Sequence, residues 1–284
     1  MASLDGLHTS GVATALEVPC ISVAPAAPHT HTVVFLHGRG DNVHSFTAAL
    51  AAARDSQSRT LADALPSFRW VFPQAPMRVV ASSIATNGPQ PTTWPQWFDV
   101  WDTRDFASRE ELQAEGLREA VPAIQRILAS EATLLGGRWD RLVLAGISMG
   151  GATSVHTLFN LEVPLPTGGR LGAFIGFSCR CPFSGRTLAQ MREVLGLGLA
   201  PTALAADSSS DILRNTPMLL EHCVDDPVVP VANGRALCET LRGFGAKVEW
   251  KEYPSGGHWF NSPSGMDDVI SFLSKHLAES GRVR

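Results

Sequence analysis

Short apolar runs alternate with longer amphipathic segments along this chain, and the alternation predicts an α/β fold. Each run contains five or six residues, mainly Val, Ile, Leu and Phe, as buried parallel strands do. The runs occupy residues 32–36, 68–72, 141–145, 173–178 and 217–222. The order of strand and helix patterns indicates one mostly parallel central sheet flanked by helices.

The segments between these runs predict the helices. Apolar residues recur at helical spacing in residues 43–54, 108–132, 186–195, 232–244 and 266–278. Ser108 and Glu111 have the spacing of a capping box, so the second helix should begin there. Pro122 should kink or split that helix, because proline lacks the amide hydrogen that a helix needs. Residues 21–23 and 247–253 are expected to be edge strands.

Length and composition narrow the class of protein. The chain has 284 residues, 44% of them hydrophobic and 18% charged, so it can bury the core of one large α/β domain. We expect residues 1–284 to form that single domain, with residues 1–18 loosely held. A net charge of −4 without a basic block argues against nucleic acid as a partner. No apolar run approaches the ~20 residues of a transmembrane segment.

The N-terminal sequence and the cysteines indicate a cytoplasmic protein. The chain starts without a basic segment followed by an apolar core, so no secretory signal is expected. Five cysteines, an odd number without zinc-ligand spacing, favour reduced thiols in a reducing compartment. The sequence contains no metal-binding constellation and no cofactor motif, so neither a metal nor a cofactor is expected.

One stretch carries the strongest chemical signal. Residues 146–150 fit G-x-S-x-G, with a buried strand before them and a helix rich in small residues after them. Strand, tight turn and helix together form the nucleophile elbow of α/β-hydrolases, which presents a serine hydroxyl at the carboxyl edge of the sheet. Ser148 is therefore the predicted nucleophile, and an incidental serine in a glycine-rich turn is the weaker alternative.

The loop after the strand at residues 32–36 supplies the expected partner of this elbow. Residues 37–40 fit H-G-x-G, and glycines let backbone N–H groups turn toward a substrate. We predict that the backbone N–H groups of Arg39 and Met149 form an oxyanion hole. Each such donor is typically worth ~3 kcal/mol of transition-state stabilisation.

The acid and the base of a catalytic triad are expected after the last apolar runs. Asp225 and Asp226 both qualify as the acid, and Asp226 is preferred because Pro227 fixes the chain just after it. Asp225 is expected to be solvated or to cap a turn. His258 is the predicted base, since it alone among nine histidines lies in a late glycine-rich turn. The order Ser148, Asp226, His258 is that of α/β-hydrolases.

Other histidines and cysteines are expected to be structural. His37 lies in the predicted oxyanion loop, His156 on the helix after the elbow, and His222 inside a predicted strand. Cys179 and Cys181 are not expected to be nucleophiles, because neither has an elbow.

A long stretch without periodicity, residues 77–105, carries a cluster of large aromatic side chains. They are Trp94, Trp97, Phe98 and Trp101. Such residues either pack as a local core or line an apolar acyl site, since long irregular loops in compact domains are often functional. Both alternatives stay open, and the four are kept as candidate substrate contacts. Residues 182–215 leave the core pattern and form a possible cap-like insertion over the site.

Taken together, these motifs resemble the acyl-protein thioesterase / phospholipase–carboxylesterase family of α/β-hydrolases, and its fungal-type members in particular. The landmarks run in the expected order through residues 35–41, 72–76, 97–99, 146–151, 178–179, 226–230 and 257–258. The resemblance implies an α/β-hydrolase fold and a cytosolic serine hydrolase that cleaves acyl thioesters or esters. By position it assigns the triad to Ser148, Asp226 and His258. S-acylated (palmitoylated) proteins and lysophospholipids are typical substrates of the family.

The chain departs from the family pattern near the expected acyl site. Met149 follows the serine where the family usually has glutamine, and Arg180 follows Cys179 where the family often continues differently. Residues 83–88 and 182–215 are longer than in typical members. The expected function is acyl-protein thioesterase, with a small-ester carboxylesterase or lysophospholipase as the alternative. A non-catalytic hydrolase-fold binding protein is disfavoured because all three triad residues are present.

Overall fold

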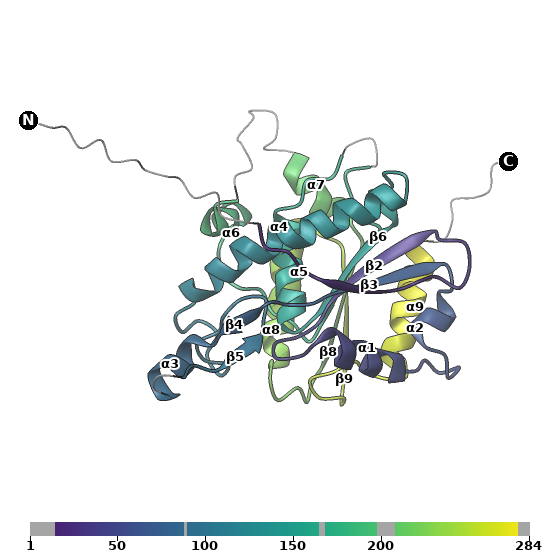
Figure 1. The fold of residues 1–284 in the computed structure, drawn as a ribbon. Coiled ribbons are helices and arrows are strands. Elements are labelled where there is room, and N and C mark those ends of the chain that lie inside the picture. Colours follow the sequence, from purple (N-terminus) through teal and green to yellow (C-terminus); the bar gives the residue numbers. More distant parts are fainter. Residues whose placement is uncertain (1–14, 88–89, 165–167, 198–207, 278–284) are drawn as a thin grey trace, which may run out of the picture.

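The computed structural model describes residues 15–87, 90–164, 168–197 and 208–277. Their central feature is a seven-stranded sheet (Figure 1). Its strands are β1 Cys20–Val23, β2 His31–Leu36, β3 Phe68–Pro73, β6 Leu142–Ile147, β7 Ala173–Phe177, β8 Met218–Cys223 and β9 Val248–Tyr253.

The strand order across the sheet is β1-β3-β2-β6-β7-β8-β9. Strand β1 runs antiparallel to β3, and every other neighbouring pair is parallel. The predicted mostly parallel sheet is therefore confirmed. The edge positions expected for residues 21–23 and 247–253 are confirmed as well, because β1 and β9 end the sheet.

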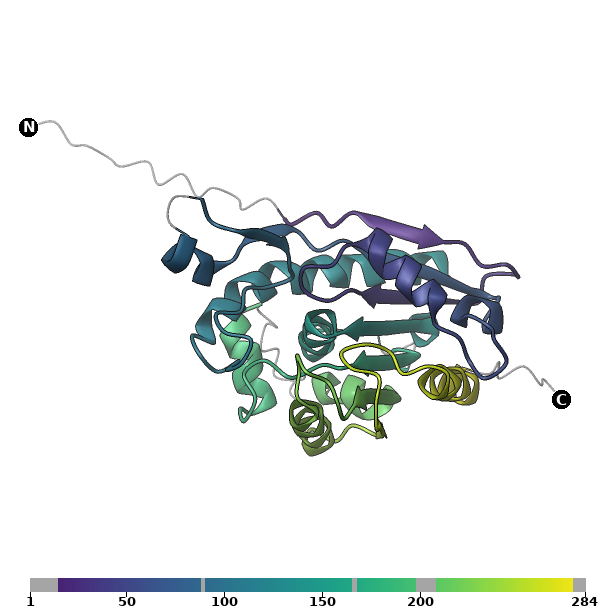
Figure 2. The ribbon, with the colours of Figure 1, turned by 90° about the horizontal axis from the view of Figure 1, so that it is seen from below.

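Helices cover both faces of the sheet (Figures 1 and 2). One face carries α1 Val43–Ala52, α2 Leu61–Ala64 and α9 Ser264–Leu277. The other carries α4 Glu111–Leu134, α5 Met149–Phe159, α6 Leu188–Leu195, α7 Ser208–Asn215 and α8 Val231–Gly243. A short 3-10 turn, Trp139–Arg141, precedes β6. No helix in the described ranges is both long enough and apolar enough to cross a membrane.

Each strand of the sheet centre contributes to two cores, because side chains alternate between the faces with a period of two. On β2, Val34 and Leu36 pack with α4 and α5, whereas Val33 and Phe35 pack with α1 and α9. All four side chains are at most 1% exposed. Burial on both faces explains why this strand appears in the sequence as an uninterrupted apolar run.

The start of α4 differs from the predicted capping box. The helix begins at Glu111, and its N-cap residue, Glu110, makes no side-chain cap hydrogen bond. Arg109 has φ +49°, and the Ser108 N–H donates to Asp105 within a preceding turn. Ser108 is therefore outside the helix. Glu110 instead accepts the N–H of Phe183 at 2.6 Å, a partner 73 residues away that no local pattern reveals.

Helix α4 also continues through Pro122, so the predicted split is wrong. A proline inside a helix costs ~3 kcal/mol. Leu117, Val121 and Ile124 on either side of it are fully buried against the core. Each such burial contributes roughly 1.5–3 kcal/mol, so packing outweighs the lost hydrogen bond.

The stretch at residues 77–105, expected to be irregular, contains a hairpin and a helix. Strands β4 Met77–Val79 and β5 Thr93–Pro95 pair antiparallel and form a separate two-stranded sheet. Helix α3 Ala81–Asn87 lies between them in the chain. The strands are only three residues long, too short to show a sequence alternation. Figure 1 shows β4, β5 and α3 together at the periphery of the molecule.

The segment at residues 182–215 contains α6 as predicted and also α7. Helix α6 is held against the α4–α5 layer: Arg118 of α4 donates to the Val194 and Leu195 carbonyls, and Arg192 of α6 donates to the Phe159 carbonyl. Residues 198–207, most of the loop predicted at 197–210, lie outside the described residues. So do residues 1–14 of the N-terminal segment expected to be loose. The cap role of residues 182–215 stays a prediction.

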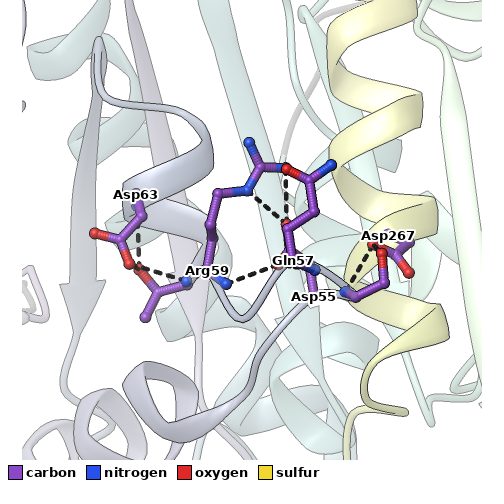
Figure 3. A network of polar contacts seen from close by, with 7 residues as sticks. Asp55, Gln57, Arg59, Asp63 and Asp267 are labelled. Carbon is purple, nitrogen blue, oxygen red and sulfur yellow. Dashed lines mark hydrogen bonds and ion pairs between the residues drawn. The ribbon is translucent and has the colours of Figure 1, made fainter.

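A polar network anchors the connection between α1 and α2 to α9 (Figure 3). Buried Asp55 accepts hydrogen bonds from the backbone N–H groups of Gln57 and Arg59, and it also pairs with the Arg59 guanidinium at 2.8 Å. Ser56 donates both its N–H and its hydroxyl to Asp267, in the first turn of α9. Figure 3 shows this network bridging the two segments. It fixes the start of α9 beside the loop that carries His258.

Glu221 is a carboxyl group buried between β8 and α9. It is 4% exposed, and a Cβ placed on Gly265 of α9 would lie 2.9 Å from its Oε2. Neither carboxyl oxygen has a well-oriented hydrogen-bond partner within the described ranges, and the nearby Tyr253 hydroxyl donates to Asp268. Burial, followed by the charge of Asp268, raises the pKa of Glu221 well above its ordinary value, against smaller opposing effects of Tyr253 and Lys251.

Glu221→Gln is therefore expected to raise the melting temperature at pH 8. A carboxyl group whose pKa is raised by folding stabilises the fold fully below its unfolded pKa of ~4.3, and this contribution is lost as the pH rises toward the folded-state pKa. Glutamine stays neutral at both pH values, so the increase in melting temperature should be largest at pH 8 and should shrink toward pH 5. Each kcal/mol of added stability should raise the melting temperature by roughly 2–4 °C. Differential scanning calorimetry at both pH values measures it.

The matched control is Glu249→Gln. Glu249 is half-exposed and paired with Lys275 at 2.7 Å, and this hydrogen bond lowers the pKa of Glu249. Its substitution should give no stability gain at pH 8. An equal gain for Glu221→Gln at both pH values, or no gain at pH 8, would contradict a buried protonated carboxyl group.

Candidate active site

The carboxyl ends of the parallel strands bring the predicted site residues to one edge of the sheet. Ile147 of β6 is in register with Phe177 of β7, which is in register with Glu221 of β8. The residues that follow, among them Ser148 and Asp226, therefore lie on the same edge, where α/β folds bind their ligands.

Ser148 occupies a strained turn between β6 and α5. Its φ is +54° and its ψ is −122°, a conformation that residues with a Cβ rarely adopt. Its N–H donates to the Phe177 carbonyl at 2.9 Å, so the neighbouring strand fixes its backbone. Helix α5 begins at Met149, whose N–H is therefore one of the helix-terminal donors without an intrahelical acceptor. The strained serine and this donor together have the form of a nucleophile elbow.

The glycines around Ser148 are required by close backbone packing. A Cβ on Gly146 would lie 2.5 Å from the carbonyl carbon and oxygen of Gly150. A Cβ on Gly150 would lie 2.4 Å from the carbonyl oxygens of Leu36 and His37, and one on Gly151 would lie 2.6 Å from the Cβ of Cys179. Any side chain at these positions would push α5 away from β2, β6 and the loop after β7.

The predicted oxyanion loop lies directly beside Ser148. A Cβ on Gly38 would be 3.4 Å from Ser148 Cβ and 3.9 Å from its Oγ. His37 is fully buried, as expected of a structural residue: its Nδ1 donates to the Gly38 carbonyl and its Nε2 accepts the Ala75 N–H. Trp97 Nε1 donates to the His37 carbonyl at 2.9 Å. These bonds hold the backbone at the entrance to this loop.

Contacts from β5 and the residues just after it hold the rest of the loop. Arg39 Nε donates to Gln96 Oε1 at 2.8 Å, and its guanidinium lies 3.8 Å from Asp99 and 4.7 Å from the ring centre of Trp94. The Gly40 N–H donates to the Pro95 carbonyl at 2.8 Å. With its side chain turned to the hairpin, Arg39 has only its backbone left for the oxyanion role predicted for it.

The four predicted aromatic contacts lie in different surroundings. Trp97 and Phe98 are fully buried, with Phe98 packed on Gly116 of α4, and this placement favours the local-core alternative for both. Trp94 is 42% exposed and lies against the predicted oxyanion loop. Trp101 is partly exposed and stacks with the guanidinium of exposed Arg109 at 4.6 Å. Of the four, Trp94 alone is an exposed side chain in contact with the loop beside Ser148.

Asp226 and His258 form a hydrogen-bonded pair on this edge. His258 Nδ1 lies 2.8 Å from Asp226 Oδ2, and the carboxylate is fully buried while the His258 side chain is 21% exposed. Asp226 Oδ1 accepts the N–H groups of Val228 and Val229. Burial alone would raise the pKa of Asp226, but the hydrogen bonds from His222, His258 and these amides hold it well below its ordinary value. The carboxylate is thus ionised and faces the His258 ring.

His222 is a second histidine on the same carboxylate, which the sequence does not single out. Its Nε2 lies 2.8 Å from the Val229 carbonyl oxygen and 3.2 Å from Asp226 Oδ2. Both atoms are acceptors, so Nε2 carries a hydrogen. The ring is 1% exposed, and a Cβ on Gly234 would lie 2.4 Å from its Nδ1. The sequence offers one signal for this contact: His222 lies near the end of a predicted strand, and Asp226 follows four residues later in the next loop.

Asp225 supports the turn that carries His258. It is exposed, and its carboxylate accepts the N–H groups of Gly256 at 3.3 Å and Gly257 at 2.8 Å. These glycines have φ values of +143° and +65°, which other residues rarely adopt. The expectation that Asp225 caps a turn is confirmed, and its two oxygens are directed to backbone amides.

The buried cysteines beside the elbow are not poised for chemistry. Burial raises the pKa of both Cys179 and Cys181 to about 12, so neither forms a thiolate readily. His156 is likewise fully buried and bonded to the Pro182 carbonyl. Within the described ranges, no group of three or more His, Cys, Asp or Glu residues could hold a metal ion.

Comparisons with known proteins identify the family. The model of the Phospholipase/Carboxylesterase family matches residues 19–195 and 189–277. An acyl-protein thioesterase 1 of Gibberella zeae is 30% identical over 260 residues, which cover 90% of this chain and 94% of that protein. An acyl-protein thioesterase 1 of Neurospora crassa is 25% identical over 261 residues, with coverages of 91% and 92%.

Solved structures agree with this result. The crystal structure of Zea mays acyl-protein thioesterase 2 has a TM-score of 0.66 and 25% identity to this chain, and the match covers 91% of this chain and 99% of that one. The fold, the sequence relatives and the family model all give the same assignment. The chain belongs to the phospholipase/carboxylesterase family of α/β-hydrolases and is a carboxylic ester or thioester hydrolase.

Proposed function

We propose that this enzyme cleaves acyl thioesters and esters through a triad of Ser148, Asp226 and His258 and an acyl-enzyme intermediate. The observation that carries the proposal is the 2.8 Å contact between His258 Nδ1 and the buried Asp226 carboxylate, on the sheet edge that presents Ser148. A serine in an elbow, a histidine and an ionised acid on one edge are the elements of acyl transfer.

In the proposed mechanism, Ser148 Oγ attacks the substrate carbonyl carbon and His258 Nε2 takes its proton. Asp226 holds the Nδ1–H tautomer and stabilises the imidazolium that forms. The backbone N–H groups of Arg39 and Met149 would bind the oxyanion. Collapse of the tetrahedral intermediate expels a thiol or alcohol, which receives the proton from His258. Water activated by His258 then hydrolyses the acyl-enzyme.

Within this class we propose an acyl-protein thioesterase-like substrate, an S-acylated protein with a long chain. The names of the fungal relatives support it. So does an apolar surface: Met77, Val79, Ile84 and Trp94, on the hairpin and α3, are all exposed. Trp94 contacts the oxyanion loop, since a Cβ on Gly40 would lie 3.8 Å from its ring. Exposed apolar groups beside the reacting carbonyl would suit an acyl chain.

We also propose a cytoplasmic location. All five cysteines are free thiols, four of them buried. This is the state that a reducing compartment maintains. The alternative function, a small-ester carboxylesterase or lysophospholipase, would use the same triad and differ in the preferred chain length and leaving group.

The substrate proposal predicts a rise in kcat/KM with acyl chain length, larger for thioesters than for matched oxyesters. Each buried methylene should add up to ~0.8 kcal/mol of binding, or about fourfold, until the apolar surface is filled. The measurement is kcat/KM for matched thioester and oxyester series, with Ser148→Ala as the blank. A maximum at short oxyesters would replace the thioesterase proposal with the small-ester alternative. If no substrate is hydrolysed faster by wild type than by Ser148→Ala, the proposed activity is contradicted.

A further inference from the structure

Arg180 is a buried guanidinium next to the proposed catalytic machinery. It lies three residues beyond the end of β7, so its Cα is at most about 11 Å from that of Phe177, whose carbonyl accepts the Ser148 N–H. Cys179, its neighbour, packs against Gly151 of the elbow helix. Arg180 itself is only 7% exposed. A charge this deeply buried normally has a countercharge.

No carboxylate in the described part of the chain forms a direct ion pair with Arg180, although the charge of nearby Glu110 acts on it. The guanidinium donates one hydrogen bond, from Nη2 to Gln113 Oε1 at 2.8 Å, and it lies 4.1 Å from the ring centre of Phe106. The nearby Glu110 accepts the N–H of Phe183, and its other oxygen lies 4.0 Å from Arg186. Burial lowers the pKa of Arg180 to about 10 against a smaller opposing effect of Glu110 and the neighbouring cysteines, so the group remains charged at neutral pH.

The surroundings of Arg180 also fix its orientation. Gln113 is 1% exposed, and its Nε2 donates to the Phe106 carbonyl at 2.9 Å, which turns its Oε1 toward Arg180. The ring of Phe106 and that of Phe98, 5.9 Å away, flank the guanidinium. A guanidinium has five N–H donors, and only one of them makes a hydrogen bond here. None of its remaining nitrogens is among the described side-chain atoms that are both fully buried and without a hydrogen-bond partner. These nitrogens are therefore accessible from outside the protein core.

Arg180 lines a cavity of about 490 Å³, into which its unpaired and unsealed nitrogens can point. Pro227 and Val228, which directly follow Asp226, form another part of its wall. The cavity therefore adjoins the catalytic edge, between the loop after β7, the loop after β8 and the segment before α4. Two acids also line it: Asp105, which is exposed and accepts the Ala107 N–H, and Glu110, which is engaged as described.

We propose that Arg180 is a specificity residue that binds an anionic group, a carboxylate or phosphate, carried by the ester or thioester substrate. This inference rests on the proposed hydrolase function and deepens it by naming a charged substrate class. A fixed guanidinium with free N–H groups presents a planar fork that matches carboxylate and phosphate oxygens. The substrate anion would supply the direct ion pair that Glu110 and Asp105, which are bonded elsewhere, do not make, and the adjoining cavity offers the space for it.

The test uses pairs of substrates that differ in one charged group. For an anion on the acyl half, the pair is p-nitrophenyl hexanoate and the mono-p-nitrophenyl ester of adipic acid. For an anion on the leaving group, it is monohexanoylglycerol and its glycerol phosphate counterpart. The readout is the ratio of kcat/KM for the charged substrate to that for the neutral one. Wild type is compared with Arg180→Gln and with Arg186→Gln, the removal of a nearby arginine that does not line the cavity.

In Arg180→Gln, the charged-to-neutral ratio should fall about 10-fold to 100-fold in one of the two pairs, mainly through KM, as expected for the loss of a charge-assisted hydrogen bond. The pair that responds identifies where the anion sits. Arg186→Gln should keep the wild-type ratios. Unchanged ratios in both pairs would overturn the proposal, even if Arg180→Gln lowers activity on all substrates, because a purely structural role moves the two members of a pair together.

Two further measurements keep the result decisive. If Arg180→Gln does not fold, Arg180→Lys replaces it: the charge stays but the planar fork is lost, so the ratio should fall less, by about 3-fold to 10-fold. If wild type hydrolyses none of the four esters, charged or neutral, the hydrolase proposal fails on its own. Binding is then read from the Tm shift that adipate or glycerol phosphate gives Ser148→Ala. A shift that Arg180→Gln abolishes supports the anion site, and no shift refutes it.

Discussion

Ser148→Ala is expected to reduce kcat/KM for every ester and thioester by at least about four orders of magnitude, because it removes the nucleophile of the proposed acyl-enzyme mechanism. Folding should be intact, since alanine keeps the Cβ and the same backbone strain at φ +54°. Steady-state kinetics and calorimetry measure the two effects. A fluorophosphonate probe should label wild type once, on the peptide that contains Ser148, and should not label the variant.

Ser148→Gly separates loss of chemistry from loss of structure. Glycine adopts positive φ without steric cost, so this variant should be as inactive as Ser148→Ala but melt at a higher temperature. Such a result would show that the turn stores strain for function. Retained hydrolysis in either variant, or probe labelling elsewhere in the chain, would remove Ser148 from the role of nucleophile.

Features that depend on neighbouring residues could be predicted from the sequence. The five central strands appear as apolar runs because both faces of the sheet are buried. The elbow is visible because residues at 146, 150 and 151 must be glycine for α5 to approach β2, β6 and Cys179. The turn before His258 is visible for the same reason, since Gly256 and Gly257 adopt positive φ. In each case a local backbone requirement restricts the residue type.

Features that depend on distant partners could not be predicted. The hydrogen bond between Glu110 and the distant Phe183 sets the beginning of α4. The capping box predicted at Ser108 does not form. The β4–β5 hairpin consists of three-residue strands whose pairing no alternation reveals. Likewise, four aromatic residues in one stretch give no indication that Trp97 is bonded to the His37 carbonyl while Trp94 stays exposed.

The histidines around Asp226 show which parts of the site could be predicted from the sequence. Motif and order are enough to choose Asp226 and His258, and the 2.8 Å contact between them supports the choice. His222 escapes detection because a strand histidine is ordinarily a packed residue, and only the folded chain brings its Nε2 to 3.2 Å from Asp226. The carboxylate thus has four hydrogen-bond partners, two histidines and two amides, which together keep it ionised despite its burial.

Asp226→Asn is accordingly expected to lower kcat/KM by about three to four orders of magnitude, as the loss of the triad acid does in known serine hydrolases. The amide oxygen should take the Oδ1 position, where it can accept the N–H groups of Val228 and Val229. The amide NH2 then faces His258 Nδ1, which must become an acceptor. Its proton moves to Nε2, and the ring can no longer remove the proton of Ser148.

Asp225→Asn is the matched control, because it changes the adjacent carboxylate in the same way. Asp225 accepts two backbone amides through separate oxygens, and asparagine can keep one of these bonds. The turn that carries His258 should therefore loosen only slightly, with a loss of kcat/KM below about tenfold. The loss in Asp226→Asn should appear in kcat, with some loss of Tm because the amide NH2 also meets the Nε2–H of His222. A loosened turn in Asp225→Asn should lower Tm with only the small kinetic loss. A larger kinetic loss in Asp225→Asn than in Asp226→Asn would transfer the role of triad acid to Asp225.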